Sequence, residues 1–280
     1  MNDRIKRYLY LFLAAMVLYG MYIVIMIVLG QQFWVLLSAY IVVVVTFYWL
    51  NRRSIWAVRG NYLYVTGFKA RAKPILQKAV AAGTKSPSAY IYLALMAVQE
   101  DKDAETAFGL LEKARKLANT VIDERNALTT LASCHWLSGD TQKAIEVLED
   151  MRASHEYTNA GVLTTLGYLY FAQGNFDKAI EISQLAMEDE PGHGAAWDNV
   201  GQVYYKLGDM EAAKENFHTA LSKRENLADS AYFLGLIYEA EGSPDSAKEY
   251  FRRAAICTIS IYNTVTEKQI EEKYNQYHAK

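Results

Sequence analysis

The side chains that most often carry out acid–base, nucleophilic or metal chemistry are scattered singly along this chain. Five histidines occur: His135, His155, His193, His218 and His278. None forms a His-x-x-x-His or His-Glu-x-x-His pair, the spacing that places two metal ligands on one face of a helix. The chain also lacks the Gly-x-x-x-x-Gly-Lys phosphate loop and the Gly-x-Ser-x-Gly nucleophile elbow. These patterns predict no catalytic residue and no metal site.

Two further features could hold a ligand but are explained better without one. The acidic cluster at residues 188–190 could bind a cation, yet a solvated helix end is the more frequent environment for such a run. Cys134 and Cys257 have no partner at metal-ligand spacing, which argues against a disulfide scaffold and suits a reducing compartment. The formal net charge of -2 argues against nonspecific nucleic-acid binding. We expect no cofactor, no nucleic-acid partner and no enzymatic activity.

Two long apolar runs near the N-terminus predict membrane-spanning helices. No charged residue occurs from residue 8 to residue 51. The runs 8–29 and 33–50 are separated only by a short polar turn, and each is long enough to cross the hydrocarbon core as a helix. A cleavable signal peptide is the alternative for the first run, but the run is long, lacks a small-x-small site and is followed directly by the second. We expect residues 8–50 to form a transmembrane hairpin in the lipid bilayer.

Basic residues on both sides of this hairpin predict its orientation. They precede the first run and follow the second, and the turn has none: Arg4, Lys6, Arg7, Arg52, Arg53 and Arg59. Because such residues stay on the cytoplasmic side, both termini should lie in the cytoplasm. No ionisable residue lies inside either run, so a transport path is not supported. We expect residues 1–52 to anchor a multi-pass protein with two spans in a bacterial inner membrane, with a eukaryotic organelle surface as the alternative.

Beyond the membrane segment, the sequence repeats itself every 34 residues. Glycine, tyrosine and alanine recur at matching places in three successive windows: Gly167, Tyr170, Gly174 and Ala179; Gly201, Tyr204, Gly208 and Ala213; Gly235, Tyr238, Gly242 and Ala247. This pattern resembles the tetratricopeptide repeat (TPR), a helix–turn–helix unit of 34 residues. The glycine at position 15 of each unit should end the first helix, and a polar residue should then cap the second: Asn175, Asp209 and Ser243.

The same register predicts how the rest of the chain is divided. Six units would span residues 53–261: 53–86, 87–124, 125–159, 160–193, 194–227 and 228–261. In the first unit, Trp56 and Gly60 fall at positions 4 and 8, but Arg59 and Pro74 depart from the pattern, and a linker is the alternative. Residues 262–280 would form a capping helix and tail. The expected fold is all-α: a right-handed α-solenoid of TPR units that follows a transmembrane hairpin and ends in a capping helix.

The resemblance to TPR proteins implies a concave groove lined by the first helix of each unit. The residues at the matching positions are mostly aromatic or uncharged and polar: Asn61, Tyr64, Ser133, Trp136, Thr164, Tyr168, Phe171, Asp198, Gln202, Tyr205, Tyr232 and Glu239. Such a surface suits an extended or helical peptide, although packing between helices is the alternative for each ring. TPR domains that clamp a terminal carboxylate carry Lys at position 5 of the first unit. Ala57 stands at that position here, so this clamp is not expected.

These expectations lead to one main function and two alternatives. The main hypothesis is a membrane-anchored scaffold or adaptor that binds a protein or peptide partner in its groove at the cytoplasmic face. The first alternative is a non-catalytic subunit of an envelope-assembly, secretion or transport complex, in which the hairpin also contacts partner helices. The second is an enzyme whose site has no recognisable motif. Because one scaffold serves many tasks, the fold alone does not choose among them.

Overall fold

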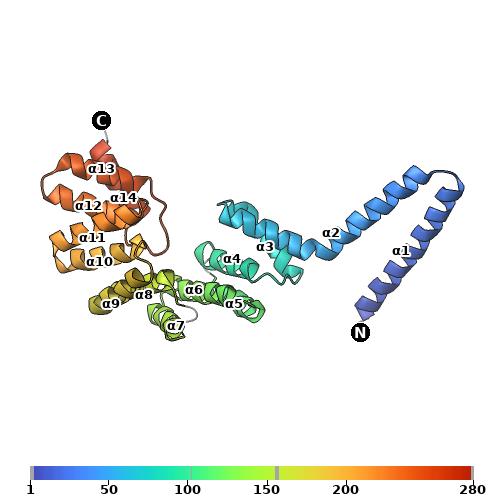
Figure 1. Ribbon diagram of the computed structural model, residues 1–280, viewed down its shortest axis with the longest axis horizontal. Coiled ribbons are helices and arrows are strands. Elements are labelled where there is room, and N and C mark those ends of the chain that lie inside the picture. Colours follow the sequence, from blue (N-terminus) through green and yellow to red (C-terminus); the bar gives the residue numbers. More distant parts are fainter. Residues whose placement is uncertain (1–2, 102, 155–157, 279–280) are drawn as a thin grey trace.

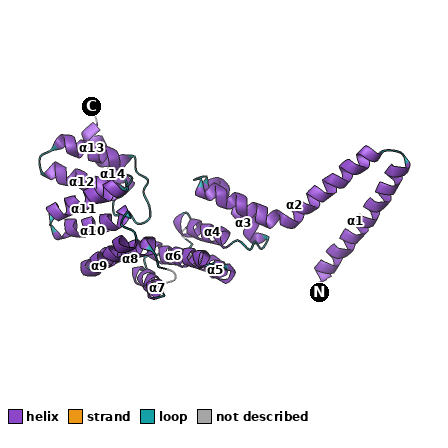
Figure 2. Cartoon of the chain, in the orientation of Figure 1, coloured by secondary structure: helices purple, strands orange, loops and turns teal. Residues whose placement is uncertain are grey.

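The computed structural model describes residues 3–101, 103–154 and 158–278, except for the side chains of residues 3–15, 32 and 278. Every regular element in these ranges is a helix, and they contain no strand (Figure 2). The fourteen helices are α1 (Asp3–Val28), α2 (Gln32–Val65), α3 (Lys69–Ala81), α4 (Pro87–Gln99), α5 (Ala104–Leu117), α6 (Val121–Leu137), α7 (Thr141–Ala153), α8 (Ala160–Gln173), α9 (Phe176–Asp189), α10 (Gly194–Leu207), α11 (Met210–Lys223), α12 (Ala228–Ala240), α13 (Pro244–Ala255) and α14 (Glu267–His278).

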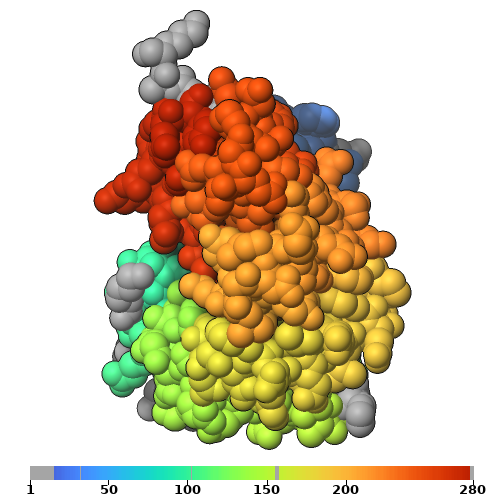
Figure 3. All heavy atoms as spheres, turned by 90° about the vertical axis from the view of Figure 1, so that its left-hand side faces the viewer, coloured from blue at the N-terminus to red at the C-terminus, as the bar shows by residue number. Residues whose placement is uncertain are grey.

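From α2 onward, successive helices pack as pairs that stack along the chain (Figure 1). The pairs are the second half of α2 with α3, α4 with α5, α6 with α7, α8 with α9, α10 with α11, and α12 with α13. Seen from the side of the C-terminal helices, the stack follows the chain order from green to red (Figure 3). The all-α solenoid expected from the sequence is therefore confirmed.

Small residues allow the two helices of a pair to approach closely. A Cβ atom added to Gly235 of α12 would lie 2.6 Å from the Phe251 ring of α13. In the first pair, a Cβ atom added to Gly60 of α2 would lie 2.6 Å from Leu76 of α3. Both contacts join positions 8 and 24 of the 34-residue register. The second half of α2 thus packs on α3 with the same close contact as a later pair, despite Arg59 and Pro74.

The turns within the pairs follow the expected chemistry with one exception. Gly174 has a φ of 83°, a left-handed conformation that ends α8. The side chains of Asn175 and Asp209 each accept a hydrogen bond from a backbone amide in the first turn of the following helix. Ser243 occupies the N-cap position of α13 as expected, but its side chain makes no such bond. The next residue, Pro244, already fixes the backbone at the start of that helix.

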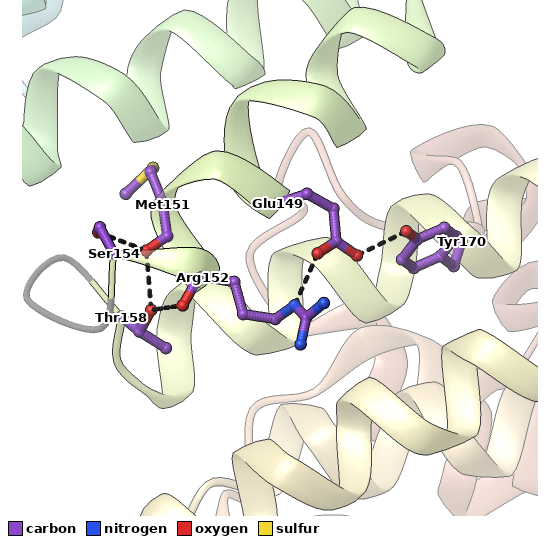
Figure 4. A network of polar contacts seen from close by, with 6 residues as sticks. All are labelled: Glu149, Met151, Arg152, Ser154, Thr158 and Tyr170. Atoms are coloured by element: carbon purple, nitrogen blue, oxygen red, sulfur yellow. Dashed lines mark hydrogen bonds and ion pairs between the residues drawn. The ribbon is translucent and has the colours of Figure 1, made fainter.

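A polar network joins the third and fourth helix pairs (Figure 4). Glu149 of α7 accepts 2.6 Å hydrogen bonds from the Tyr170 hydroxyl of α8 and from Arg152 Nε. Burial opposes ionisation of Glu149, but these two donors outweigh it and hold the pKa of its carboxyl below the ordinary value. The Thr158 hydroxyl donates a 3.0 Å hydrogen bond to the carbonyl of Met151. The bond between Glu149 and Tyr170 joins α7 to α8, and the bond from Thr158 joins the residues just before α8 to the end of α7.

Helix α2 is continuous from Gln32 to Val65 and therefore joins the apolar segment to the first pair without a linker. Within the described residues, only its portion Phe33–Val65 is long and apolar enough to cross a membrane, by length and composition. The first expected span, 8–29, lies on α1, but the side chains of residues 8–15 are outside the described part. The remainder, Met16–Val28, is a shorter apolar helix. The turn between α1 and α2 lies at the end far from the array; from there α2 runs back to the array, and α1 separates from α2 (Figure 1).

The C-terminal cap is present, but it begins later than the sequence indicated. Helix α14 starts only at Glu267 and packs on α13, so residues 262–266 of the expected cap are not helical. The Glu239 carboxylate of α12 binds the capping helix: it accepts a 2.6 Å hydrogen bond from Lys273 Nζ and a 2.9 Å hydrogen bond from the Tyr277 hydroxyl. Residues 258–266, here called the return segment, run back along the array between α13 and α14 (Figure 1).

Candidate functional site

The concave groove is the candidate site, and the return segment occupies part of it. The described residues contain no group of three His, Cys, Asp or Glu side chains that could hold a metal ion. Burial raises the pKa of the Cys134 thiol to about 12, so this thiol stays protonated at neutral pH. The groove, in contrast, holds a stretch of chain in direct contact with several of the residues that the sequence predicted.

Aromatic and hydroxyl side chains bind the first half of the return segment. The Tyr262 hydroxyl lies 2.7 Å from Ser133 Oγ of α6, and its ring meets the Tyr168 ring of α8 edge-on at 5.6 Å. Trp136 Nε1 donates a 3.0 Å hydrogen bond to the carbonyl of the residue before Tyr262. Tyr168 donates a 3.4 Å hydrogen bond to the carbonyl of the residue after it. Burial raises the pKa of the Tyr262 hydroxyl to about 12. Tyr262 therefore anchors the segment between α6 and α8 as a partly buried side chain.

Polar side chains of α10 and α12 bind the second half of the return segment. Asp229, in the first turn of α12, accepts hydrogen bonds from the backbone amides of Thr264 at 2.9 Å and Val265 at 3.0 Å. Gln202 of α10 accepts a hydrogen bond from the Thr264 hydroxyl. The Gln202 amide also donates to Asp198 at 2.8 Å and to Asp229 at 3.2 Å. The backbone of the segment is thus bound by buried side chains, as a peptide ligand would be.

Two buried carboxyl groups lie within this polar network. Burial and the nearby charge of Asp229 raise the pKa of Asp198 to about 7. Burial also raises the pKa of Asp229, but the amides of Thr264 and Val265 donate to its carboxylate and oppose that shift. The two amide donors therefore favour ionisation of Asp229 over ionisation of Asp198. The Ser230 hydroxyl completes the network by donating to Asp198.

The other seven predicted groove residues fall into three groups. Four of them contact neighbouring helices: Phe171 packs on Phe176, Tyr205 on Phe233 and Tyr232 on Phe251, and Glu239 binds the cap. Thr164 lines a cavity of about 240 Å³ beside the return segment, and its hydroxyl has no hydrogen-bond partner among the described residues. Asn61 and Tyr64 lie apart from the return segment, on α2.

An open hollow lies in the groove near its α2 end. It has a volume of about 380 Å³ and lies between α4 and α6, lined by Ser88, Ile91, Tyr92, Leu95, Asn126, Thr129 and Thr130. Tyr64 stacks on Tyr92 with ring centroids 4.2 Å apart, and Asn61 donates a 3.2 Å hydrogen bond to Ser86. The sequence analysis did not single out the residues that line this hollow. They could have been found, because most occupy positions 2, 5 and 9 of the second and third expected units.

Comparison with protein families identifies the repeats. Residues 135–203 match one tetratricopeptide repeat model and residues 199–260 match a second. The chain therefore contains tetratricopeptide repeats in these ranges, which include α8–α13. A search of curated protein sequences gives no significant match.

Solved structures of TPR proteins share this fold at low sequence identity. A tetratricopeptide repeat protein from Parabacteroides merdae has a TM-score of 0.63 and 14% identity, with 81% of this chain and 84% of that chain covered. PilW, described as a type IV pilus biogenesis factor, has a TM-score of 0.57 and 17% identity, with coverage of 79% and 98%. The Cut9–Hcn1 structure of the APC/C has a TM-score of 0.58 and 20% identity. This alignment covers 81% of the present chain but only 43% of the one it matches.

Proposed function

We propose that this protein is a membrane-anchored TPR scaffold that binds a protein or peptide partner in its concave groove at the cytoplasmic face. The observation that carries the proposal is the return segment, because it is a non-helical stretch of chain, with a turn at residues 261–262, bound in that groove. Trp136 and Tyr168 bind its carbonyls, and Asp229 binds its amides. Side chains that bind a backbone in this way are compatible with an extended peptide.

The open hollow between α4 and α6 is the part of the groove that we assign to the partner. Ile91, Tyr92 and Leu95 offer apolar contact, and Asn126 and Thr129 offer hydrogen-bonding groups beside them. Asn61 and Tyr64 from the predicted set extend this surface along α2. The predicted residues from α6 to α12 that bind the return segment would reach a partner only if that segment were displaced.

The membrane placement combines both apolar helices. Spans over residues 8–29 and 33–50 would put both termini in the cytoplasm, and the continuity of α2 would hold the array at a limited set of angles to the bilayer. A bacterial inner membrane fits the charge pattern.

The second candidate function is a subunit of an envelope-assembly or secretion complex. The fold similarity to PilW, a pilus biogenesis factor, and the exposed apolar surface of α2 favour it.

The groove assignment predicts different outcomes for two matched threonine substitutions. Thr129 in the hollow and Thr219 on α11 both donate a hydrogen bond to the carbonyl four residues earlier in their helix, and both are half-buried. Thr129→Arg should fill the hollow and reduce partner capture from solubilised membranes by about tenfold or more, the equivalent of ~1.4 kcal/mol. Thr219→Arg should leave capture unchanged. Equal capture by both variants and the wild type would exclude the hollow as the binding surface.

The topology can be checked separately by protease access. In sealed right-side-out vesicles, the array should be protected from added protease and should become sensitive only after the bilayer is opened, because both termini face the inside. Cleavage of the array in intact vesicles would reverse the proposed orientation. Release of the intact chain from the membrane by carbonate washing would show that the apolar helices do not span it.

A further inference from the structure

Outside its apolar half, helix α2 carries an exposed row of apolar side chains. Ile55, Val58, Tyr62 and Val65 follow Asn51 with spacings of four, three, four and three residues. Val58, Tyr62 and Val65 are 70%, 67% and 70% exposed. Buried residues of α2 in the same region lie away from this row: at 100° per residue, Ala57 and Leu63 lie about 120° to either side of it and Gly60 about 180° away. The array therefore does not cover this row.

The same spacing continues into the apolar half of α2. Counting back from Asn51 gives Tyr48, Val44, Ile41, Leu37 and Trp34, all of them exposed. We call the ten residues from Trp34 to Val65 the α2 seam. Helix α1 does not cover it, because α1 meets α2 at Val35 and Ser38, which lie on another face. The span from residue 34 to residue 65 is about 47 Å long and contains more than four heptads.

Apolar residues that alternate at intervals of three and four over at least three or four heptads are typical of a coiled coil. Within the span, where most residues are apolar, this spacing carries little information. Beyond Leu50 it is informative, because the residues between the seam positions include Arg52, Arg53, Ser54 and Arg59. A single polar residue at a core position, such as Asn51 in the seam, often fixes the register in which two helices of a coiled coil pair.

We propose that two copies of this chain pair in parallel through the α2 seam. A second copy is the partner that the observations favour, because it offers the same seam over both the apolar and the polar parts of the helix. Copies inserted into one bilayer in the same direction would align in parallel, and this point alone rests on the proposed membrane placement. The arrays would then lie on the outer sides of the pair, with their grooves free.

The charges beside the seam are compatible with this pairing. In a parallel pair, Arg59 of one copy would lie near Ser54 of the other, so no like charges are opposed. Arg52 is held on its own helix, with Nη1 2.6 Å from the Trp49 carbonyl and the guanidinium 4.5 Å from the Trp49 ring.

A lipid surface fits the seam less well than a second copy does. If α2 continues straight out of the bilayer, the seam extends about 21 Å from Asn51 to Val65, away from the headgroups.

Disulfide mapping in membranes tests the proposal with the full-length chain. In a background with Cys134→Ala and Cys257→Ser, the variants Val58→Cys and Tyr62→Cys should form covalent dimers on mild oxidation, because identical seam positions would face each other at bonding distance. Arg53→Cys, an exposed position off the seam, is the matched control and should remain monomeric. Equal cross-linking at all three positions, or none at the seam positions, would overturn the proposal.

A second measurement separates a lost dimer from a lost fold. Val58→Glu should convert the detergent-solubilised protein from dimer to monomer, measured as mass, and Arg53→Glu should leave the dimer intact. Both variants should keep the wild-type helicity, because Val58 is exposed and Arg53 lies off the seam. A wild-type protein that is monomeric in both detergent and lipid discs would contradict the pairing. Adducts of Val58→Cys with a different membrane protein would show that the seam serves another partner.

Discussion

Replacing Asp229 with alanine is expected to detach the return segment and to lower the free energy of unfolding by about 3–5 kcal/mol. The carboxylate accepts hydrogen bonds from the amides of Thr264 and Val265 and from the side chain of Gln202. Alanine would leave the two backbone amides without a partner in a buried site, and each buried unpaired group costs about 1–3 kcal/mol. The Gln202 amide would keep its hydrogen bond to Asp198. The loss of repulsion with Asp198 offsets part of this cost.

Asp245→Ala provides the matched control for this prediction. Asp229 and Asp245 both lie in the first turn of a helix, where a carboxylate interacts favourably with the helix dipole. Asp245 is exposed, so its loss should cost less than about 1 kcal/mol. Chemical denaturation of the two variants in detergent would compare them directly. Equal destabilisation would show that the bonds to the return segment add nothing beyond the dipole interaction.

The second large effect concerns pH. The pKa of Asp198 is raised to about 7 in the folded chain, above its ordinary value of 3.8. A raised carboxyl pKa stabilises the fold below the unfolded value, and this contribution is lost as the pH rises through about 7. Asp198→Asn cannot ionise, so the wild type should lose stability relative to this variant between pH 4 and pH 7. The expected difference is on the order of a few kcal/mol.

Unfolding measured at several pH values would test this expectation. The relevant charged neighbour is Asp229 in the same network, and His193 and Arg224 line the adjacent cavity. The difference in free energy of unfolding between Asp198→Asn and the wild type should grow steadily from pH 4 to pH 7. Glu188→Gln, which removes an exposed carboxyl group, should instead give a curve parallel to that of the wild type. A parallel curve for Asp198→Asn would contradict the raised pKa.

The repeating part of the fold could be predicted because its contacts recur at fixed positions. The Gly235–Phe251 contact in the last pair and the Gly60–Leu76 contact in the first both follow from positions 8 and 24 of the register. The end of α8 at Gly174 and the N-cap of α9 at Asn175 both follow from local turn chemistry. Such local and periodic signals are visible in a single sequence.

The return segment could not be predicted, because its contacts are neither local nor periodic. Tyr262 meets Ser133, a residue 129 positions earlier in the chain, and Thr264 meets Gln202 across 62 positions. Nothing in the spacing of residues 258–266 indicates such partners. Trp136 and Tyr168, two of the residues predicted to bind a partner, bind backbone carbonyls of their own chain in this structure, and their contact with a partner stays a prediction.

Hydrogen exchange measured at the backbone amides of Thr264 and Val265 is the most direct test of whether the return segment occupies the groove. In the full-length wild type, both amides should be strongly protected, because each donates to the buried Asp229 carboxylate. In Asp229→Ala the same amides should exchange quickly, while helix amides of the first pair keep their protection. Exchange of both wild-type amides at the rate of an unstructured peptide would show that the return segment does not occupy the groove.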